Sequence, residues 1–125
     1  TKPPWGNLTA IDLNTGDHLW QIPLGTSKDL APFPFWWIKG APNVGGPTVT
    51  ASGLTFIAAT SDYYLRAFNT ETGDELAKFR LPTGGHATPM TFKTENGKQI
   101  VVIAAGGHWA VGSPASDHLI AFALP

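Results

Sequence analysis

The chain has 125 residues, with eight Lys and Arg against nine Asp and Glu, and it contains no cysteine. This length suits one compact domain or a part of one, and the missing cysteines exclude disulfides and thiolate metal sites. The balanced charge offers no basic field for a phosphate backbone, so a nucleic-acid partner is not expected. Fourteen Gly and eleven Pro, set among Val, Ile, Thr and Phe, predict short strands joined by sharp turns. The predicted fold class is therefore all-β.

An internal repeat organises these strands. Residues 8–24 align without a gap on residues 65–81, and residues 45–68 match residues 86–122 with extra residues in two loops. Each unit reads as up to four strands separated by turn signals, as in the four-stranded antiparallel blades of a β-propeller. In chain order, we expect strands near 8–12, 18–23, 47–51, 54–59, 63–69, 75–81, 88–93, 99–104 and 118–124.

These strands predict a partial β-propeller of about two and a quarter blades. Residues 1–24 would end one blade, residues 25–45 form a long connection, residues 46–81 a complete blade and residues 86–125 a last, incomplete blade. Blades bury their faces against their neighbours, so the remainder of the propeller is an expected partner, and the missing strand of the last blade is expected from a longer chain. Because the end faces and edges lack partners, this segment by itself is expected to self-associate.

The turn between the first two strands carries the motif A-x-D-x-x-T-G-x-x-x-W at residues 10–20. Gly16 allows the positive φ of a tight turn, Asp12 can accept hydrogen bonds from turn amides, and Trp20 offers a flat face that can wedge between blades. The second copy has Asn69 in place of Asp and Ala77 in place of Trp, which predicts a looser contact there. The motif resembles the tryptophan-docking motif of dehydrogenases that use pyrroloquinoline quinone (PQQ).

The rest of the chain strengthens this resemblance. The segments GLTFIAATSDYYLRAFNTETG, LPTGGHATPMTF and GKQIVVIAAGGHWAVGSPASDHLIAFALP look like the closing part of membrane-bound PQQ-dependent glucose dehydrogenases and their quinate/shikimate relatives. The resemblance implies the C-terminal part of an eight-bladed propeller at the periplasmic face of the bacterial inner membrane. It also implies a parent enzyme that holds PQQ with Ca²⁺, oxidises a sugar or cyclic polyol hydroxyl, first of all that of an aldose such as glucose, and passes electrons to ubiquinone.

The repeat also indicates where a cofactor would lie. Asp62 and His108 follow Ile-Ala-Ala strands at equivalent positions of adjacent blades, so both are expected at one end of the blades with side chains turned toward the propeller axis. The resemblance implies that Asp62 and the pair Gly107-His108 lie close to the quinone. From the residues alone, Asp62 could instead cap turn amides, and His108 could be a loop histidine in solvent.

Three more residues are candidates for cofactor binding. Trp109 would cover one edge of the pocket or pack between blades, and Asn43 and His86 are weaker candidates on connections that return to the same end. His18 and His118 are expected to be structural. The histidines have no HxxxH or HxH spacing, so no metal site is expected. The family's calcium ligands and catalytic base have no counterpart here, so we expect no catalytic residue, no bound PQQ or Ca²⁺ and no activity from this segment alone.

Residues 30–38, LAPFPFWWI, lie in the long connection and fit neither blade nor site. Alternating prolines exclude a helix or a central strand. The loop either folds over the propeller or exposes an aromatic patch to the bilayer interface or to a membrane quinone. Two other functions stay open: a quinate/shikimate dehydrogenase of the same family, and a non-enzymatic propeller scaffold for protein assembly.

Overall fold

A computed structural model describes residues 2–123, and within that range the protein is built from antiparallel strands. The first sheet pairs β1 (Asn7–Ile11) with β2 (His18–Pro23). The second sheet has the order β3 (Thr48–Val49), β4 (Leu54–Ile57), β5 (Tyr64–Asn69), β6 (Glu75–Arg80). The third has the order β7 (Met90–Lys93), β8 (Gln99–Ala105), β9 (His118–Ala123). These strands lie close to the predicted ranges, and the all-β fold class is confirmed; residue 124 of the last predicted strand is outside the described residues.

Two strands of the second sheet are shorter than predicted. β4 stops at Ile57 because Ala59 takes a positive φ of 59° and its amide donates to Gly85 of another loop, at 2.8 Å, instead of to β5. β3 contains only Thr48 and Val49, since the chain turns immediately afterwards, with the Gly53 amide donating to the Thr50 carbonyl at 3.1 Å.

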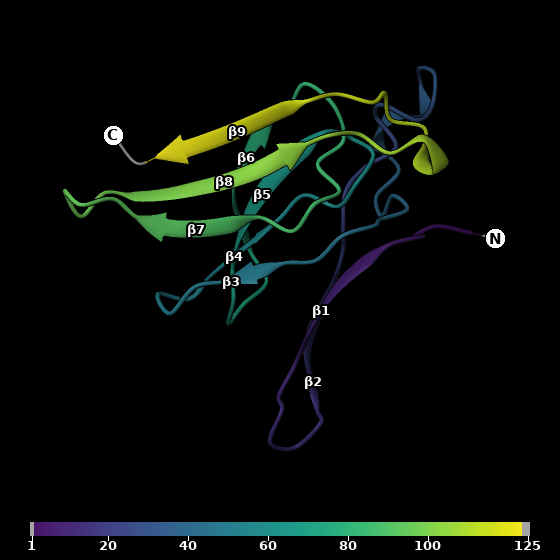
Figure 1. Cartoon of the computed structure of the whole chain (residues 1–125). Helices are drawn as coiled ribbons and strands as arrows, with labels where there is room; N and C mark the ends of the chain where they lie inside the picture. The colour runs from purple at the N-terminus through teal and green to yellow at the C-terminus, as the bar shows by residue number, and fades with distance from the viewer. Residues whose placement is uncertain (1, 124–125) are drawn as a thin grey trace.

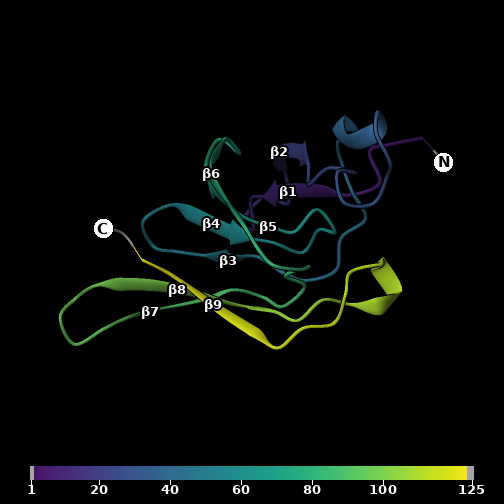
Figure 2. The ribbon, with the colours of Figure 1, turned by 90° about the horizontal axis from the view of Figure 1, so that it is seen from above.

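The three sheets pack face against face in chain order (Figure 2). Side chains between the first and second sheets form one apolar core: Leu8, Leu24, Ile57, Ala59 and Phe68, with Trp20 and Ile22 at its margin. A second core lies between the second and third sheets: Ala58, Leu65, Leu81, Val101, Ile103 and Ala105. Burial of apolar side chains from two neighbouring sheets is the way propeller blades stabilise one another.

Trp20 joins the first two sheets as the sequence motif predicts. Its indole Nε1–H donates to the carbonyl oxygen of Thr70 at 3.0 Å, and its ring covers Gly73, where an added Cβ would lie 2.8 Å from the indole. Asp12 accepts from the Asn14 amide at 2.8 Å in one turn, and Asn69 accepts from the Glu71 amide at 2.8 Å in the other. Asn therefore replaces Asp in the second turn without loss of its capping bond.

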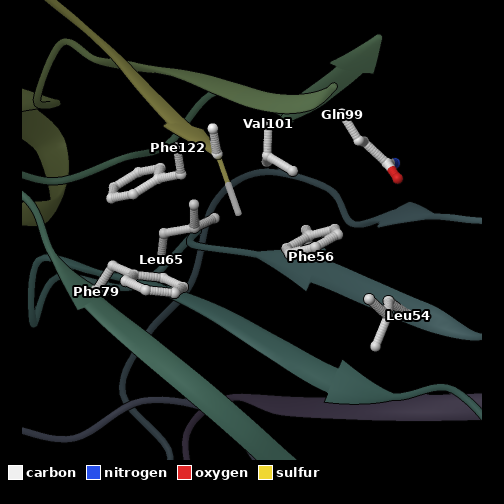
Figure 3. A pocket seen from close by; sticks show the side chains of 8 residues that line it. Leu54, Phe56, Leu65, Phe79, Gln99, Val101 and Phe122 are labelled. Atoms are coloured by element: carbon white, nitrogen blue, oxygen red, sulfur yellow. The ribbon is translucent and has the colours of Figure 1, made fainter. Parts of the chain in front are cut away.

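The interface between the second and third sheets contains an apolar cavity of about 150 Å³ (Figure 3). Phe79 of β6 and Phe122 of β9 meet across it, with ring centroids 4.9 Å apart. Its other lining residues include Leu54, Phe56, Leu65 and Val101.

The connections that precede β3, β5, β7 and β9 gather at one end of the sheets, which we call the loop end; it comprises residues 24–47, 58–63, 81–89 and 106–117 (Figure 1). Backbone hydrogen bonds join these loops, from the Ala59 amide to Gly85 O at 2.8 Å and from the Gly107 amide to Gly84 O at 2.9 Å. Alternate strands of an antiparallel sheet end at the same edge, which is why loops far apart in sequence meet here.

The long connection contains one helical turn, contrary to the expectation from its prolines. A 3₁₀ turn, η1, covers Phe35–Trp37, and the Phe35 amide donates to the Pro32 carbonyl at 3.0 Å. Pro34 stands before the turn, where its missing N–H costs no hydrogen bond, so the prolines exclude a long helix but not a single turn. No helix within residues 2–123 has the length and apolar character needed to cross a membrane.

Candidate functional site

His108 and Trp109 lie at the loop end, directly after β8. His108 is exposed, Trp109 is 88% exposed at the start of the 3₁₀ turn η2 (Trp109–Val111), and the two rings are nearly parallel, at 14°, with centroids 6.3 Å apart. A flat aromatic face beside an imidazole with free edges suits a planar ligand that carries oxygen acceptors.

Gly107 shapes the loop that carries this pair. Its φ is +68°, and a Cβ there would overlap the carbonyl oxygen of Pro114. The close approach is therefore to the returning limb of the same loop, where the Ser116 amide donates to Gly106 O at 2.9 Å. The resemblance implies that Gly107 lies close to the quinone, and contact of Gly107 with a cofactor stays a prediction.

His86 lies beside His108, with the ring centroids 6.0 Å apart and the planes at 75°. Its Nε2 is 2.9 Å from Ser113 Oγ, and its Nδ1 is 3.3 Å from the carbonyl oxygens of both Val44 and Ala59. Both ring nitrogens thus have partners within the protein. Sequence reasoning missed Ser113, since no motif marks it and it is 27 residues from its histidine partner.

Asn43 is exposed at the loop end and pairs with Thr60 as an isolated antiparallel bridge. This bridge ties the end of the long connection to the loop that follows β4. Asn43 is therefore at the predicted end of the sheets, and its contact with a cofactor stays a prediction.

Asp62 is at the same end as His108, as predicted, but its side chain turns away from it. The carboxylate is 0% exposed and accepts hydrogen bonds from the Thr26 amide (2.8 Å), the Thr26 hydroxyl (2.9 Å) and the Thr60 hydroxyl (2.6 Å). Two guanidinium nitrogens of Arg66, which is 4% exposed, donate to it at 3.0 and 2.5 Å. Asp62 presents no surface to a ligand here: its carboxylate caps one loop amide, that of Thr26, and pairs with Arg66. A cofactor contact of Asp62 stays a prediction.

The charge state of Asp62 follows from two opposing effects. Burial by itself raises the pKa of this carboxyl, but the hydrogen bonds and positive charge of Arg66, helped by the hydroxyls of Thr60 and Thr26, outweigh it. The net effect is a pKa below the usual value of 3.8, so Asp62 is an anion at neutral pH. A carboxylate held in this way is a poor proton acceptor.

The same network fastens the long connection to the second sheet. Arg80 donates to the two carboxylate oxygens of Asp29 at 2.6 and 2.7 Å, and also to the backbone oxygen of Asp62 at 2.8 Å. Arg66 donates from Nε to Glu75 at 3.1 Å. Sequence reasoning missed Arg66 and Thr26, whose contacts with Asp62 depend on how the loop folds.

At residues 107–109 the loop end therefore offers a ligand an imidazole, an indole face and backbone polar groups. Among the described residues, no group of three or more His, Cys, Asp or Glu is arranged to hold a metal ion. By their chemistry, the exposed His108 imidazole can hydrogen-bond to the oxygens of a planar quinone and the Trp109 indole can stack on it, and no residue described here is arranged to supply its metal.

Residues 1–101 match the family model described as PQQ, the glucose/ethanol/alcohol dehydrogenase β-propeller domain. The chain belongs to this family. It is 48% identical to the quinoprotein glucose dehydrogenase of Escherichia coli (strain K12) and 50% identical to the quinate/shikimate dehydrogenase (quinone) of Acinetobacter baylyi, over 99% and 98% of its own length. It spans 16% of the length of each of these two relatives.

A solved structure supports the propeller fold of the family. A europium-containing methanol dehydrogenase superposes with a TM-score of 0.63 at 28% identity, over 81% of this chain and 15% of the other. The predicted resemblance to the PQQ-dependent glucose and quinate/shikimate dehydrogenases is confirmed, and with it the assignment of the sheets to a partial propeller.

Proposed function

We propose that this chain is part of a PQQ-dependent dehydrogenase that oxidises a sugar or polyol hydroxyl, with an aldose such as glucose as the first candidate substrate. The observation that carries the proposal is the exposed His108–Trp109 pair at the loop end of family propeller sheets. Relatives of nearly equal identity carry glucose and quinate/shikimate in their names, so quinate or shikimate is the second candidate substrate.

The redox chemistry would be that of PQQ, which, when bound, would serve as the hydride acceptor. The residues of this chain bind and orient the cofactor and the substrate. His108 donates a hydrogen bond from its imidazole to an oxygen of the cofactor or substrate, and Trp109 covers one edge of the pocket and excludes water. Asp62, buried and ionised, holds the loop after β4 in place through Thr26 and Arg66.

The catalytic base and the Ca²⁺ ligands of such an enzyme would come from the rest of the parent protein, which is also the partner that closes the propeller. We propose the periplasmic face of the inner membrane as its location and ubiquinone as its electron acceptor. Support comes from the sequence resemblance and from the Acinetobacter baylyi relative, whose name includes a quinone. A protein-assembly scaffold is the less favoured function, because the relatives named above are dehydrogenases.

The test uses the full-length parent protein loaded with PQQ and Ca²⁺. Dye reduction is measured with glucose and with quinate, and PQQ affinity is measured by titration. We expect His108→Ala to weaken PQQ or substrate binding by about fivefold to tenfold, the size of one lost neutral hydrogen bond, with an unchanged melting temperature. The control is His18→Ala, which removes an exposed histidine at the opposite end of the first sheet.

Absence of PQQ-dependent dye reduction with any sugar or polyol would reject the proposed activity. If His108→Ala lowers the melting temperature and the activity in parallel, His108 is a packing residue rather than a ligand contact.

A further inference from the structure

His86 connects three loops of the loop end. Its Nδ1 faces the Val44 carbonyl of the long connection and the Ala59 carbonyl after β4, both at 3.3 Å. Its Nε2 meets Ser113 Oγ at 2.9 Å in the loop after β8. The Oγ of Ser113 in turn accepts a hydrogen bond from the backbone amide of His108 at 2.8 Å. The side chain thus reaches the candidate ligand residue through one intervening hydroxyl.

Carbonyl oxygens only accept, so Nδ1 of His86 is the donor toward Val44 and Ala59. Ser113 Oγ shares a hydrogen bond with Nε2 of His86 and accepts one from the His108 amide, and it lies 3.3 Å from the His108 carbonyl, to which its hydroxyl can also donate. Ser113 is buried, so its hydroxyl depends on His86 and on the backbone of His108 for its hydrogen bonds.

Gly84 makes this contact possible. A Cβ at that position would overlap His86 Nε2 and would lie 2.7 Å from Ser113 Oγ. Any larger residue would therefore push the imidazole and the hydroxyl apart. The sequence Gly84-Gly85-His86 is thus suited to placing an imidazole against the loop that carries His108 and Trp109.

From this geometry we infer that His86 is a positioning residue. It holds the backbone of residues 108–113, and through that backbone the His108 imidazole and the Trp109 indole, and it does not itself contact the ligand. Both ring nitrogens are already engaged, so a bond from His86 to a ligand would have to break one of these contacts. The inference rests on the proposed function in one respect: the positioned residues are those that we propose to contact cofactor or substrate.

Two substitutions of His86 test the hydrogen bonds of Nε2 and of Nδ1 separately. His86→Gln provides a side-chain oxygen near the position of Nε2, which can still accept from Ser113. His86→Asn is shorter; its amide can still donate to the Val44 and Ala59 carbonyls but does not reach Ser113. Ser113→Ala removes the hydroxyl without touching the histidine. The matched control is His118→Ala, which removes an exposed imidazole whose hydrogen-bonded serine, Ser116, is only two residues away.

The measurement is hydrogen exchange of the peptide spanning residues 106–113, in the full-length parent without PQQ, followed by PQQ titration and substrate kinetics. We expect Ser113→Ala and His86→Asn to raise the exchange rate of this loop by about fivefold, the equivalent of one lost neutral hydrogen bond. His86→Gln and His118→Ala should exchange as the parent does. In the first two variants, PQQ affinity or KM should weaken more than kcat falls.

Unchanged exchange in both Ser113→Ala and His86→Asn would overturn the inference. So would a His86→Gln protein with normal exchange but weakened PQQ or substrate binding, because His86 would then touch the ligand directly. If the parent neither binds PQQ nor oxidises a substrate, the proposed function fails, while the exchange rates still decide whether His86 holds the loop. Ser113→Ala keeps the test available if a His86 variant does not fold.

Discussion

Replacing Asp62 by Asn is expected to loosen the loop end rather than remove a ligand contact. The carboxylate accepts five hydrogen bonds, two of them from the guanidinium of Arg66. The side-chain amide of Asn has only one acceptor oxygen, and its NH2 group would face donors to which it cannot hydrogen-bond. Arg66, buried at 4% exposure, would keep only Glu75 as an anionic partner.

The expected loss of stability follows from the burial of the Asp62–Arg66 pair. Removing one partner of a buried ion pair costs about 3–5 kcal/mol, because the other charge stays buried without compensation. An opening free energy lowered by about 3 kcal/mol corresponds to roughly a hundredfold faster exchange for amides that the network protects. The Thr26 amide, which donates directly to Asp62, is the most sensitive reporter.

Hydrogen exchange of peptides containing Thr26 and Asp62, in the full-length parent, checks this expectation. The matched control is Asp29→Asn, which breaks the more exposed pair with Arg80 and should cost about 1 kcal/mol or less. Normal exchange at Thr26 together with lost PQQ binding would refute the reasoning and make Asp62 a cofactor contact, as first predicted from its place in the sequence.

The pH dependence has a definite sign. The pKa of Asp62 in the folded protein is below the usual 3.8, so its contribution to stability is complete above that value and is lost as the pH falls below it toward the folded pKa. The Asp62→Asn variant should therefore unfold in acid at a higher pH than the parent. Below pH 3.8, the stability of the variant should depend less steeply on pH than that of the parent.

Two further predictions concern packing and assembly. Gly73→Ala should destabilise the parent by about 2–3 kcal/mol, because residue 73 has a positive φ and the new methyl group would meet the Trp20 ring. Gly53→Ala, which has a similar φ but open space around it, should cost about 1 kcal/mol. Urea unfolding of the two variants measures the difference. Residues 1–125 expressed alone should self-associate in light scattering and bind no PQQ in titration. A strictly monomeric species, or one that binds PQQ, would contradict this expectation.

Much of the blade structure was predictable because its signals are local. The Thr-Gly turns place the strands of each hairpin, and the repeat aligns one blade with the next, so the β1–β2 and β5–β6 hairpins occur where expected. The wedge formed by Trp20 was predictable for a similar reason: a large aromatic side chain at a fixed distance from a turn packs against the neighbouring sheet. The 3₁₀ turn at Phe35–Trp37 was not predicted, because proline spacing excludes only longer helices.

By itself the sequence determined the strand order, the family and the end of the sheets at which Asp62, His86 and His108 lie. Only the tertiary structure decided what these side chains do there. Thr26 is 36 residues from Asp62, and Ser113 is 27 residues from His86, so both partners depend on how separate loops meet. Strand and turn positions follow from short-range preferences of the backbone, whereas the burial and pairing of a polar side chain depend on which distant donors the folded chain brings within hydrogen-bonding distance.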